Sequence, residues 1–258
     1  MTFSPGLSVR AAMASDRGRV RQENEDACLV APERGLFVVS DGMGGHQAGA
    51  AASRIVTNVL PTLLERELGW DELSSERVRR SLTRAIRELS GQLREEAKKR
   101  PDLAGMGATV ALALLMGRHA HIAHLGDSRA YLFRRGRLQQ LTADHTVTAA
   151  LLHLGEIEEK DALGHPARHR LTRYVGMEGE ALPDLRVVEL RVGDCLLLCS
   201  DGLTGMVPDR HIAQVLRRQR TPEEACEALV AAANAAGGRD NVSVIVIDID
   251  STAPGTDR

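Results

Sequence analysis

Aspartates directly follow apolar, strand-like runs at several places in this chain. The runs AAMASD, LFVVSD, HIAHLGD and LLLCSD end at Asp16, Asp41, Asp127 and Asp201. A fifth aspartate, Asp240, stands just before the last apolar run, in GGRDNVSVIV. If that last strand runs antiparallel to the others, its start lies at the same edge of the sheets as their ends. We therefore expect these carboxylates to converge at one edge.

Carboxylates brought this close repel one another, so such a cluster is unfavourable unless something neutralises its charge. Divalent cations do so, and an all-oxygen set without paired histidines or cysteines suits Mg²⁺ or Mn²⁺ rather than structural zinc. The segment DGMGGH, from Asp41 to His46, adds glycines that let the backbone approach a ligand, which makes the Gly42 carbonyl a candidate ligand. Any single aspartate here is equally well explained as a turn residue. The repetition at matching strand ends favours a metal site.

Hydrophobic periodicity predicts short strands followed by two amphipathic helices. The first strands are expected at residues 7–15, 26–31 and 36–40, and the helices at about residues 48–63 and 78–93. The last strand, at residues 242–249, is apolar on both faces, which indicates a sheet covered on both sides. Each helix has one apolar face and is expected outside the sheets. The predicted fold is α+β, a four-layer α-β-β-α sandwich of two antiparallel sheets flanked by helices.

No repeat or low-complexity linker interrupts the chain, so we expect a single domain over residues 7–250 and a disordered tail at 251–258. From residue 145 to about residue 179 the chain is polar and charged, and we expect a short helix followed by a mobile surface insertion, the latter within residues 149–179. Lysine and arginine total 33 against 35 acidic residues, which indicates neither nucleic-acid nor membrane binding. The start lacks the apolar stretch of a signal peptide, and the cysteines form no Cys-x-x-Cys pair. These features favour a cytoplasmic protein.

Several histidines have structural explanations. His119 and His121 alternate along a strand without acidic neighbours, so we expect them on the surface of a strand. Asp144 and His145 are expected at a turn and helix cap rather than as metal ligands.

Eight strings, spread over nearly the whole chain, carry a resemblance to a known family. They are SDRGRVRQENEDA, VVSDGMGGH, GMGATV, HLGDSRAY, LTADHT, HPARHRLTR, LLLCSDGL and GGRDNVSVIV, and they follow in the family's order. The chain resembles the metal-dependent PPM, or PP2C-type, serine/threonine protein phosphatases, in particular the free-standing bacterial forms. The resemblance implies a pair of antiparallel sheets flanked by helices, in agreement with the layers expected above.

The resemblance also implies roles for the acidic residues. Asp41 resembles the carboxylate that bridges two metal ions, and Gly42 the residue whose carbonyl binds the first ion. Asp201 and Asp240 resemble ligands of the second ion. Asp127, together with Asp201, resembles part of a third and weaker site. The implied cofactors are two Mn²⁺ or Mg²⁺ ions, or three if the weaker site fills.

Other residues near these motifs have implied or open roles. Glu25 resembles the family's acidic residue near the second ion, acting through water, whereas Asp16 is expected to be a turn residue. Arg21 resembles the arginine that holds the substrate phosphate, which suits the two-pronged grip of a guanidinium. Some relatives carry a histidine as a proton donor directly after the Asp-Gly pair, but Met43 stands there in this chain. His46 is the candidate acid instead, with a helix cap or a supporting role beside the metals as the alternative.

The implied reaction is hydrolysis of phosphoserine and phosphothreonine in proteins. Two cations lower the pKa of a shared water, so the resulting hydroxide attacks phosphorus directly without a phosphoenzyme. Expected partners are phosphorylated proteins made by a separate serine/threonine kinase, and the chain is expected to be a monomer. Three alternatives stay open: a phosphatase of small phosphorylated molecules, one dedicated to a regulatory partner, and an inactive phosphoprotein-binding module. The presence of Asp41, Asp201 and Asp240 disfavours the inactive module.

Overall fold

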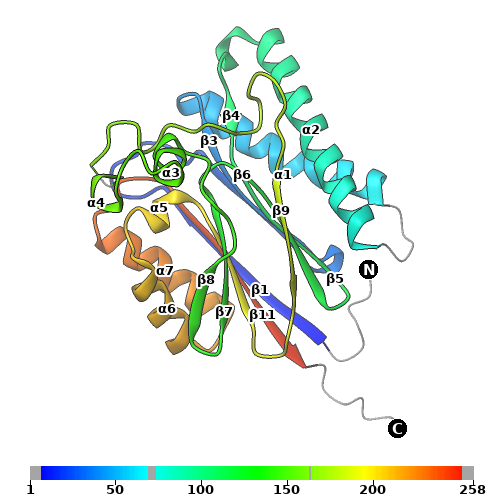
Figure 1. The fold of residues 1–258 in the computed structure, drawn as a ribbon, viewed down its shortest axis with the longest axis vertical. Coiled ribbons are helices and arrows are strands. Elements are labelled where there is room, and N and C mark those ends of the chain that lie inside the picture. The colour runs from blue at the N-terminus through cyan, green and yellow to red at the C-terminus, as the bar shows by residue number, and fades with distance from the viewer. Residues whose placement is uncertain (1–6, 69–73, 163, 252–258) are drawn as a thin grey trace.

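Two antiparallel sheets form the centre of the molecule in the computed structural model, which describes residues 7–68, 74–162 and 164–251 (Figure 1). The strands of the first sheet are β1 (Leu7–Asp16), β7 (Arg129–Arg134), β8 (Arg137–Gln140), β10 (Cys195–Cys199) and β11 (Val242–Ser251). Those of the second are β2 (Asp26–Ala31), β3 (Leu36–Met43), β4 (Gly107–Ala108), β5 (Val110–Met116), β6 (His119–Leu125) and β9 (Asp184–Glu189). Their orders are β1-β11-β10-β7-β8 and β2-β3-β5-β6-β9, with β4 beside the end of β3.

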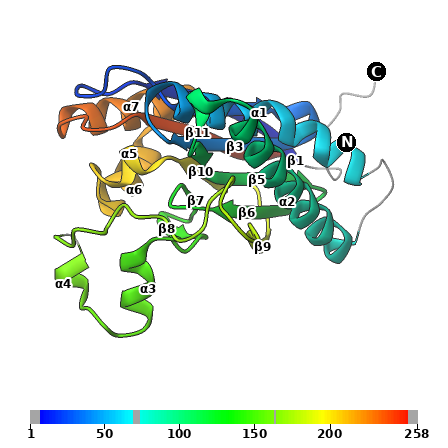
Figure 2. The same ribbon diagram turned by 90° about the horizontal axis from the view of Figure 1, so that it is seen from above.

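Helices cover the outer face of each sheet. The second sheet carries α1 (His46–Leu68) and α2 (Ser75–Lys99), and the first carries α5 (Asp201–Thr204), α6 (Asp209–Arg218) and α7 (Pro222–Ala235). Figure 1 shows α1 and α2 on one side of the strands and α6 and α7 on the other. The short helices α3 (Val147–His153) and α4 (Glu159–Ala162) project away from the sheets in Figure 2. The predicted α+β sandwich is confirmed.

Central strands are buried on both faces because their side chains alternate between two cores. In β3, Val38 packs beneath α1 and α2, whereas Val39 packs between the two sheets. In β11, Val246 packs beneath α6 and α7, and Ile247 packs between the sheets. This two-sided burial explains why both strands read as continuous apolar runs rather than as alternating ones.

Two local predictions differ from the structure. The cap of α3 is Thr146, whose hydroxyl accepts the N–H of Ala149, and not Asp144 or His145. His121, expected on a strand surface, is 3% exposed, because β5 and β9 flank its strand and its side chain shares the face of β6 that lies beneath the helices with Ala123 and Leu125. The predicted tail at 251–258 begins at the last residue of β11, and its other residues lie outside the described part.

Strand direction determines which residues meet at the edge of the sheets. The pairing of β11 with both β1 and β10 is antiparallel, so Val242, its first residue, lies opposite Asp16 at the end of β1. The segment before β11 therefore lies at the edge where β1 and β10 end. In the ranges that the structure describes, no helix is long and apolar enough to span a bilayer.

Candidate metal centre

Four of the predicted aspartates line one cavity of about 430 Å³ at this edge. Asp41 lies near the end of β3, and Asp127 lies in the turn between β6 and β7. Asp201 is the first residue of α5, directly after β10, and Asp240 precedes β11. The antiparallel arrangement expected from the sequence thus brings them together. The fifth, Asp16, does not line this cavity; its Oδ1 accepts the N–H of Gly18, as expected of a turn residue.

Burial and mutual repulsion make this cluster unfavourable as a set of free carboxylates. The pKa of Asp41 is raised well above its ordinary value, first by burial and then by the charges of Asp26, Asp201, Asp127 and Asp240. Burial, followed by the charge of Asp201, raises the pKa of Asp127 to about 8. Positive charge placed between these groups would relieve both effects.

Unsatisfied oxygens show where that positive charge fits. Within the described residues, Asp201 Oδ1 and Asp26 Oδ1 are buried and accept no hydrogen bond. Buried polar atoms without a partner are costly and rare, and a hard divalent cation satisfies carboxylate oxygens directly or through water. The donor set at this edge therefore fits Mg²⁺ or Mn²⁺.

Asp26 is a member of the cluster that the sequence interpretation missed. It is the first residue of β2 and lies directly opposite Asp41 in the antiparallel register, so both side chains share one face. Ser200 donates a hydrogen bond of 2.7 Å to its other oxygen. Burial raises its pKa to about 7, and the charges of Asp201 and Asp240 add to this. Its position at the start of a strand could have identified it, by the same reasoning that identified Asp240 just before the last strand.

Glycines allow the start of α1 to lie directly against the end of β3. A Cβ on Gly42 would fall 1.9 Å from the Gly49 carbonyl, and one on Gly49 would fall 2.0 Å from a carboxylate oxygen of Glu25. Glu25 itself lines the cavity, and its backbone carbonyl accepts the N–H of Gly42. Both predicted residues, Gly42 and Glu25, therefore lie at the cavity.

Arg21 also lines the cavity. Its guanidinium donates to Asp240 Oδ2 at 2.9 Å, and its side chain is half exposed. A positive group at this position can contact both the acidic cluster and an incoming phosphate. Met43 lines the cavity too, whereas the side chain of His46 lies outside what the structure describes.

Asn241 fastens the loop that carries Arg21. Its Oδ1 accepts the N–H of Glu25 at 2.8 Å, and its Nδ2 donates to the carbonyls of Arg17 and Glu23 at 2.9 and 2.8 Å. The side chain is 4% exposed, so these bonds are shielded from water. Asn241 thereby ties the loop to the residue next to Asp240.

We expect Asn241→Ala to lower kcat/KM for phosphopeptides by about tenfold to a hundredfold, because the Arg21 loop loses its fixed position. Steady-state kinetics on one phosphothreonine peptide measures the effect. Asn58→Ala, on the exposed face of α1, is the matched control and should match the unaltered protein. Equal kinetics for the Asn241 variant and the unaltered protein would contradict this role.

Thr109 joins the strand that carries Asp41 to the turn that carries Asp127. Its hydroxyl accepts the Asp41 N–H at 2.9 Å and lies 2.6 Å from the hydroxyl of Ser128. Its own N–H donates to the Asp41 carbonyl at 2.8 Å. The sequence string GMGATV contained this threonine, but nothing in that string indicated its partners.

His169 reaches the cavity from the segment that follows α4. Its Nδ1 lies 3.5 Å from Asp201 Oδ2, and this contact raises the pKa of the imidazole. Sequence reasoning assigned His169 no role, because the contact depends on how the segment folds back over the sheets.

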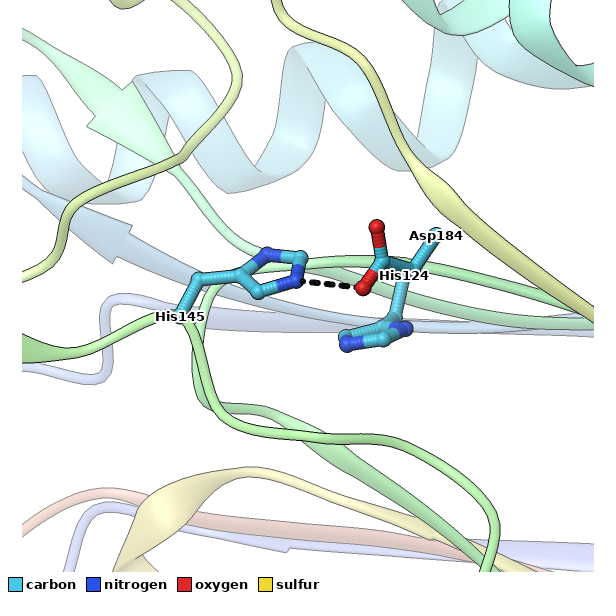
Figure 3. Close-up of side chains that lie close together, drawn as sticks. All are labelled: His124, His145 and Asp184. Atoms are coloured by element: carbon cyan, nitrogen blue, oxygen red, sulfur yellow. Dashed lines mark hydrogen bonds and ion pairs between the residues drawn. The ribbon is translucent and has the colours of Figure 1, made fainter. Parts of the chain in front are cut away.

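A second group of potential metal ligands lies beside the cavity and consists of His124, His145 and Asp184 (Figure 3). The two rings stack, with centroids 4.4 Å apart, and His145 Nε2 lies 3.2 Å from Asp184 Oδ2. Arg173 donates to both oxygens of Asp184 at 2.7 and 3.1 Å, so this carboxylate already has a cationic partner. Because Gly126 N–H donates to His145 Nδ1, the group supports the turn that carries Asp127.

Comparisons with known proteins agree with this geometry. The family model described as protein phosphatase 2C matches residues 16–235. The serine/threonine phosphatase stp of Listeria monocytogenes is 38% identical over 256 residues, covering 96% of this chain and 99% of that protein. The crystal structure of Stp1 from Staphylococcus aureus aligns with a TM-score of 0.86 at 32% identity, covering 99% of both chains. The catalytic domain of PstP in complex with two manganese ions aligns with a TM-score of 0.79 at 37% identity, covering 95% of this chain and 99% of that one.

Proposed function

This chain belongs to the protein phosphatase 2C family, and from that premise we propose which of its residues carry the reaction. It is a metal-dependent protein-serine/threonine phosphatase, with Mn²⁺ or Mg²⁺ as its cofactor. Its substrates are phosphorylated proteins. The observation that supports the site most strongly is the single cavity lined by Asp41, Asp127, Asp201 and Asp240, with raised carboxyl pKa values.

We propose that Asp41 would hold both ions, because it is the buried carboxylate on which the charges of Asp26, Asp127, Asp201 and Asp240 all act. Gly42 would bind the first ion through its carbonyl, and Asp201 and Asp240 would bind the second. The unsatisfied Oδ1 of Asp201 supports its part in this set. Asp127 and Asp201 would form a weaker third site.

Glu25 and Asp26 are proposed to support these ligands without binding the ions directly. Both residues are buried, at 7% and 9% exposure, and Glu25 lines the cavity. Glu25 would contact the second ion through water. Asp26, opposite Asp41 in the sheet, would add negative charge that holds cations in the cluster.

When bound, the two ions activate a water for direct attack on phosphorus and offset charge on the phosphoryl oxygens. Arg21 is proposed to grip those oxygens, since its guanidinium already reaches the rim of the cluster at Asp240. Its grip fixes the phosphate for in-line attack. His46 is the proposed proton donor to the leaving hydroxyl, from its position at the start of α1.

Membership of the family also supports proposals about domain organisation, cellular location and substrates. We propose one domain over residues 7–250, since the core between the two sheets draws on segments from both ends of the chain, from Leu7 to Ile249. We also propose that the protein is a cytoplasmic monomer and that its substrates are made by a separate serine/threonine kinase. Phosphatase activity on one regulatory partner or on a small phosphorylated molecule is the second candidate, because both would use the same cavity.

One experiment separates these functions. Peptides containing phosphoserine, phosphothreonine or phosphotyrosine are compared side by side with p-nitrophenyl phosphate, with Mn²⁺, Mg²⁺ or EDTA present. We expect metal-dependent hydrolysis of the phosphoserine and phosphothreonine peptides, complete loss in EDTA, and full recovery when Mn²⁺ is restored. Thiol alkylation should have no effect, because burial raises the pKa of Cys28 and Cys199 to about 12 and keeps both thiols protonated. Hydrolysis that persists in EDTA would overturn the proposal.

A further inference from the structure

A second hollow adjoins the metal cavity on the side of the Arg21 loop. It has a volume of about 540 Å³ and lies between that loop and the first turns of α1. Arg17, Gln22 and Asn24 line it from the loop, and Gln47 and Arg54 from the helix. We refer to it below as the arginine hollow.

The arginine hollow and the metal cavity are lined by neighbouring residues at two places in the chain. Asn24 lines the hollow, and its neighbour Glu25 lines the metal cavity. On the helix side, Gln47 lines the hollow and Gly45 lines the metal cavity. A peptide whose phosphate lies among the aspartates can therefore reach the hollow with a residue close to the phosphorylated one.

The guanidinium groups of the hollow are not occupied by carboxylates. Among the described residues, the Arg17 guanidinium donates to the backbone carbonyl of Gln22 alone, at 3.0 Å. The Arg54 carbonyl accepts the Thr57 hydroxyl, but its guanidinium has no hydrogen bond or ion pair to any of these residues. The acid that lines the hollow is Glu23, so the lining has a positive excess.

The cavity on the other side of the metal cluster has a different character. Its acidic residues are Asp127, Asp144 and Asp201, against the arginines Arg129 and Arg168, so its lining has an acidic excess. Arg129 is bound to both oxygens of Asp144, at 2.8 and 2.7 Å, and Arg168 donates to His169 at 2.6 Å. The positive groups on that side already have partners within the protein. The surroundings of the cluster are therefore asymmetric, with available arginines on the Arg21 side.

We propose that the arginine hollow binds an acidic side chain of the phosphoprotein substrate, a glutamate or aspartate close to the phosphorylated residue. The proposal rests on the phosphatase function and adds a sequence preference to it. Arginine forks bind carboxylates through paired, charge-assisted hydrogen bonds, and the Gln47 amide adds a neutral donor. Because both arginines are exposed, the contact would favour selection among substrates and their rate of capture more than tight binding.

The test uses phosphothreonine peptides that differ only in the residues flanking the phosphothreonine, which are glutamate, glutamine or lysine. For the unaltered protein, kcat/KM should be highest for the glutamate peptide and lowest for the lysine peptide. In Arg54→Glu, the ratio of kcat/KM for the glutamate peptide to that for the glutamine peptide should fall about tenfold. Arg54→Gln should give an intermediate ratio, and raising NaCl to about 0.5 M should shrink the preference.

Arg79→Glu is the matched control, since Arg79 is exposed in the N-terminal part of α2 and its guanidinium has no partner among the residues that the structure describes. It should keep the ratio of the unaltered protein. A ratio near one in the unaltered protein, or an unchanged ratio in Arg54→Glu, would overturn the proposal. Hydrolysis of the glutamine peptide reports the phosphatase function separately, so its absence would count against that function and not against the charge preference.

Discussion

Asp41→Asn is expected to abolish phosphatase activity and, at the same time, to stabilise the metal-free protein. Without the carboxylate that joins the two ion positions, kcat should fall by about a thousandfold or more, which corresponds to about 4 kcal/mol of lost transition-state stabilisation. The stability change has the opposite direction. Asp41 lies buried among other aspartates, and its raised pKa shows that the folded chain tolerates its charge poorly. Removing that charge should raise the free energy of unfolding in EDTA by about 1–3 kcal/mol at pH 7.5.

Thermal unfolding with and without Mn²⁺, alongside peptide kinetics, measures both effects. The unaltered protein should gain stability from Mn²⁺, whereas Asp41→Asn should gain far less because it binds the ions weakly. Asp250→Asn is the control, since Asp250 pairs with Arg10 at the end of β11 far from Asp240. It should keep full activity and the full response to Mn²⁺. Retained activity in Asp41→Asn would remove the basis of the proposed site.

The fold was predictable because each layer leaves a local pattern. Two-sided burial of β3 and β11 appears as unbroken apolar runs, and the single apolar face of α2 appears as helical spacing from Val78 to Leu93. Pairing order does not appear in such patterns. Nothing local indicates that β4 pairs with the end of β3, or that residues after α4 fold back so that His169 reaches Asp201. These contacts depend on segments far apart in the chain.

The residues of the candidate site likewise divide into those that a local sequence pattern identifies and those that depend on pairing between distant segments. Asp41, Asp127 and Asp201 were found because each follows its own strand, a signal contained in a few residues. Asp26 was missed because its place in the acidic cluster depends on strand register. It becomes a neighbour of Asp41 only when β2 pairs with β3. Thr109 was missed for a related reason, since its role lies in hydrogen bonds to residues 68 and 19 positions away.

The metal-free protein is expected to lose stability as the pH rises from 6.5 to 8. The pKa values of Asp26 and Asp127 are raised in the folded chain to about 7 and about 8, from an ordinary 3.8. A carboxyl with a raised pKa binds more protons in the folded than in the unfolded chain, so stability falls as pH rises between the two values. Each such proton contributes at most about 1.4 kcal/mol per pH unit.

The buried histidines His121 and His145 act in the opposite direction, but only at lower pH. The pKa values of His121 and His145 are lowered by burial from 6.5 to about 4, so these groups favour unfolding as the pH falls below 6.5. Above pH 6.5 these two histidines are largely neutral in both states. His169 differs, because its contact with Asp201 raises its pKa, and it therefore adds to the fall in stability as the pH rises. The slope from pH 6.5 to 8 thus reports the acidic cluster together with His169, and aspartate variants separate the two.

Urea unfolding in EDTA at several pH values within that window measures the slope, and the same series with saturating Mn²⁺ is the comparison. Bound cations favour the ionised carboxylates, so the fall in stability should disappear or reverse with Mn²⁺. Asp127→Asn should reduce the slope in EDTA, because it removes the group that titrates at about 8. A slope in EDTA that neither Asp127→Asn nor Asp26→Asn reduces would mean that the proton is held outside the acidic cluster. The acidic cluster would then not be what makes the folded chain dependent on its metals.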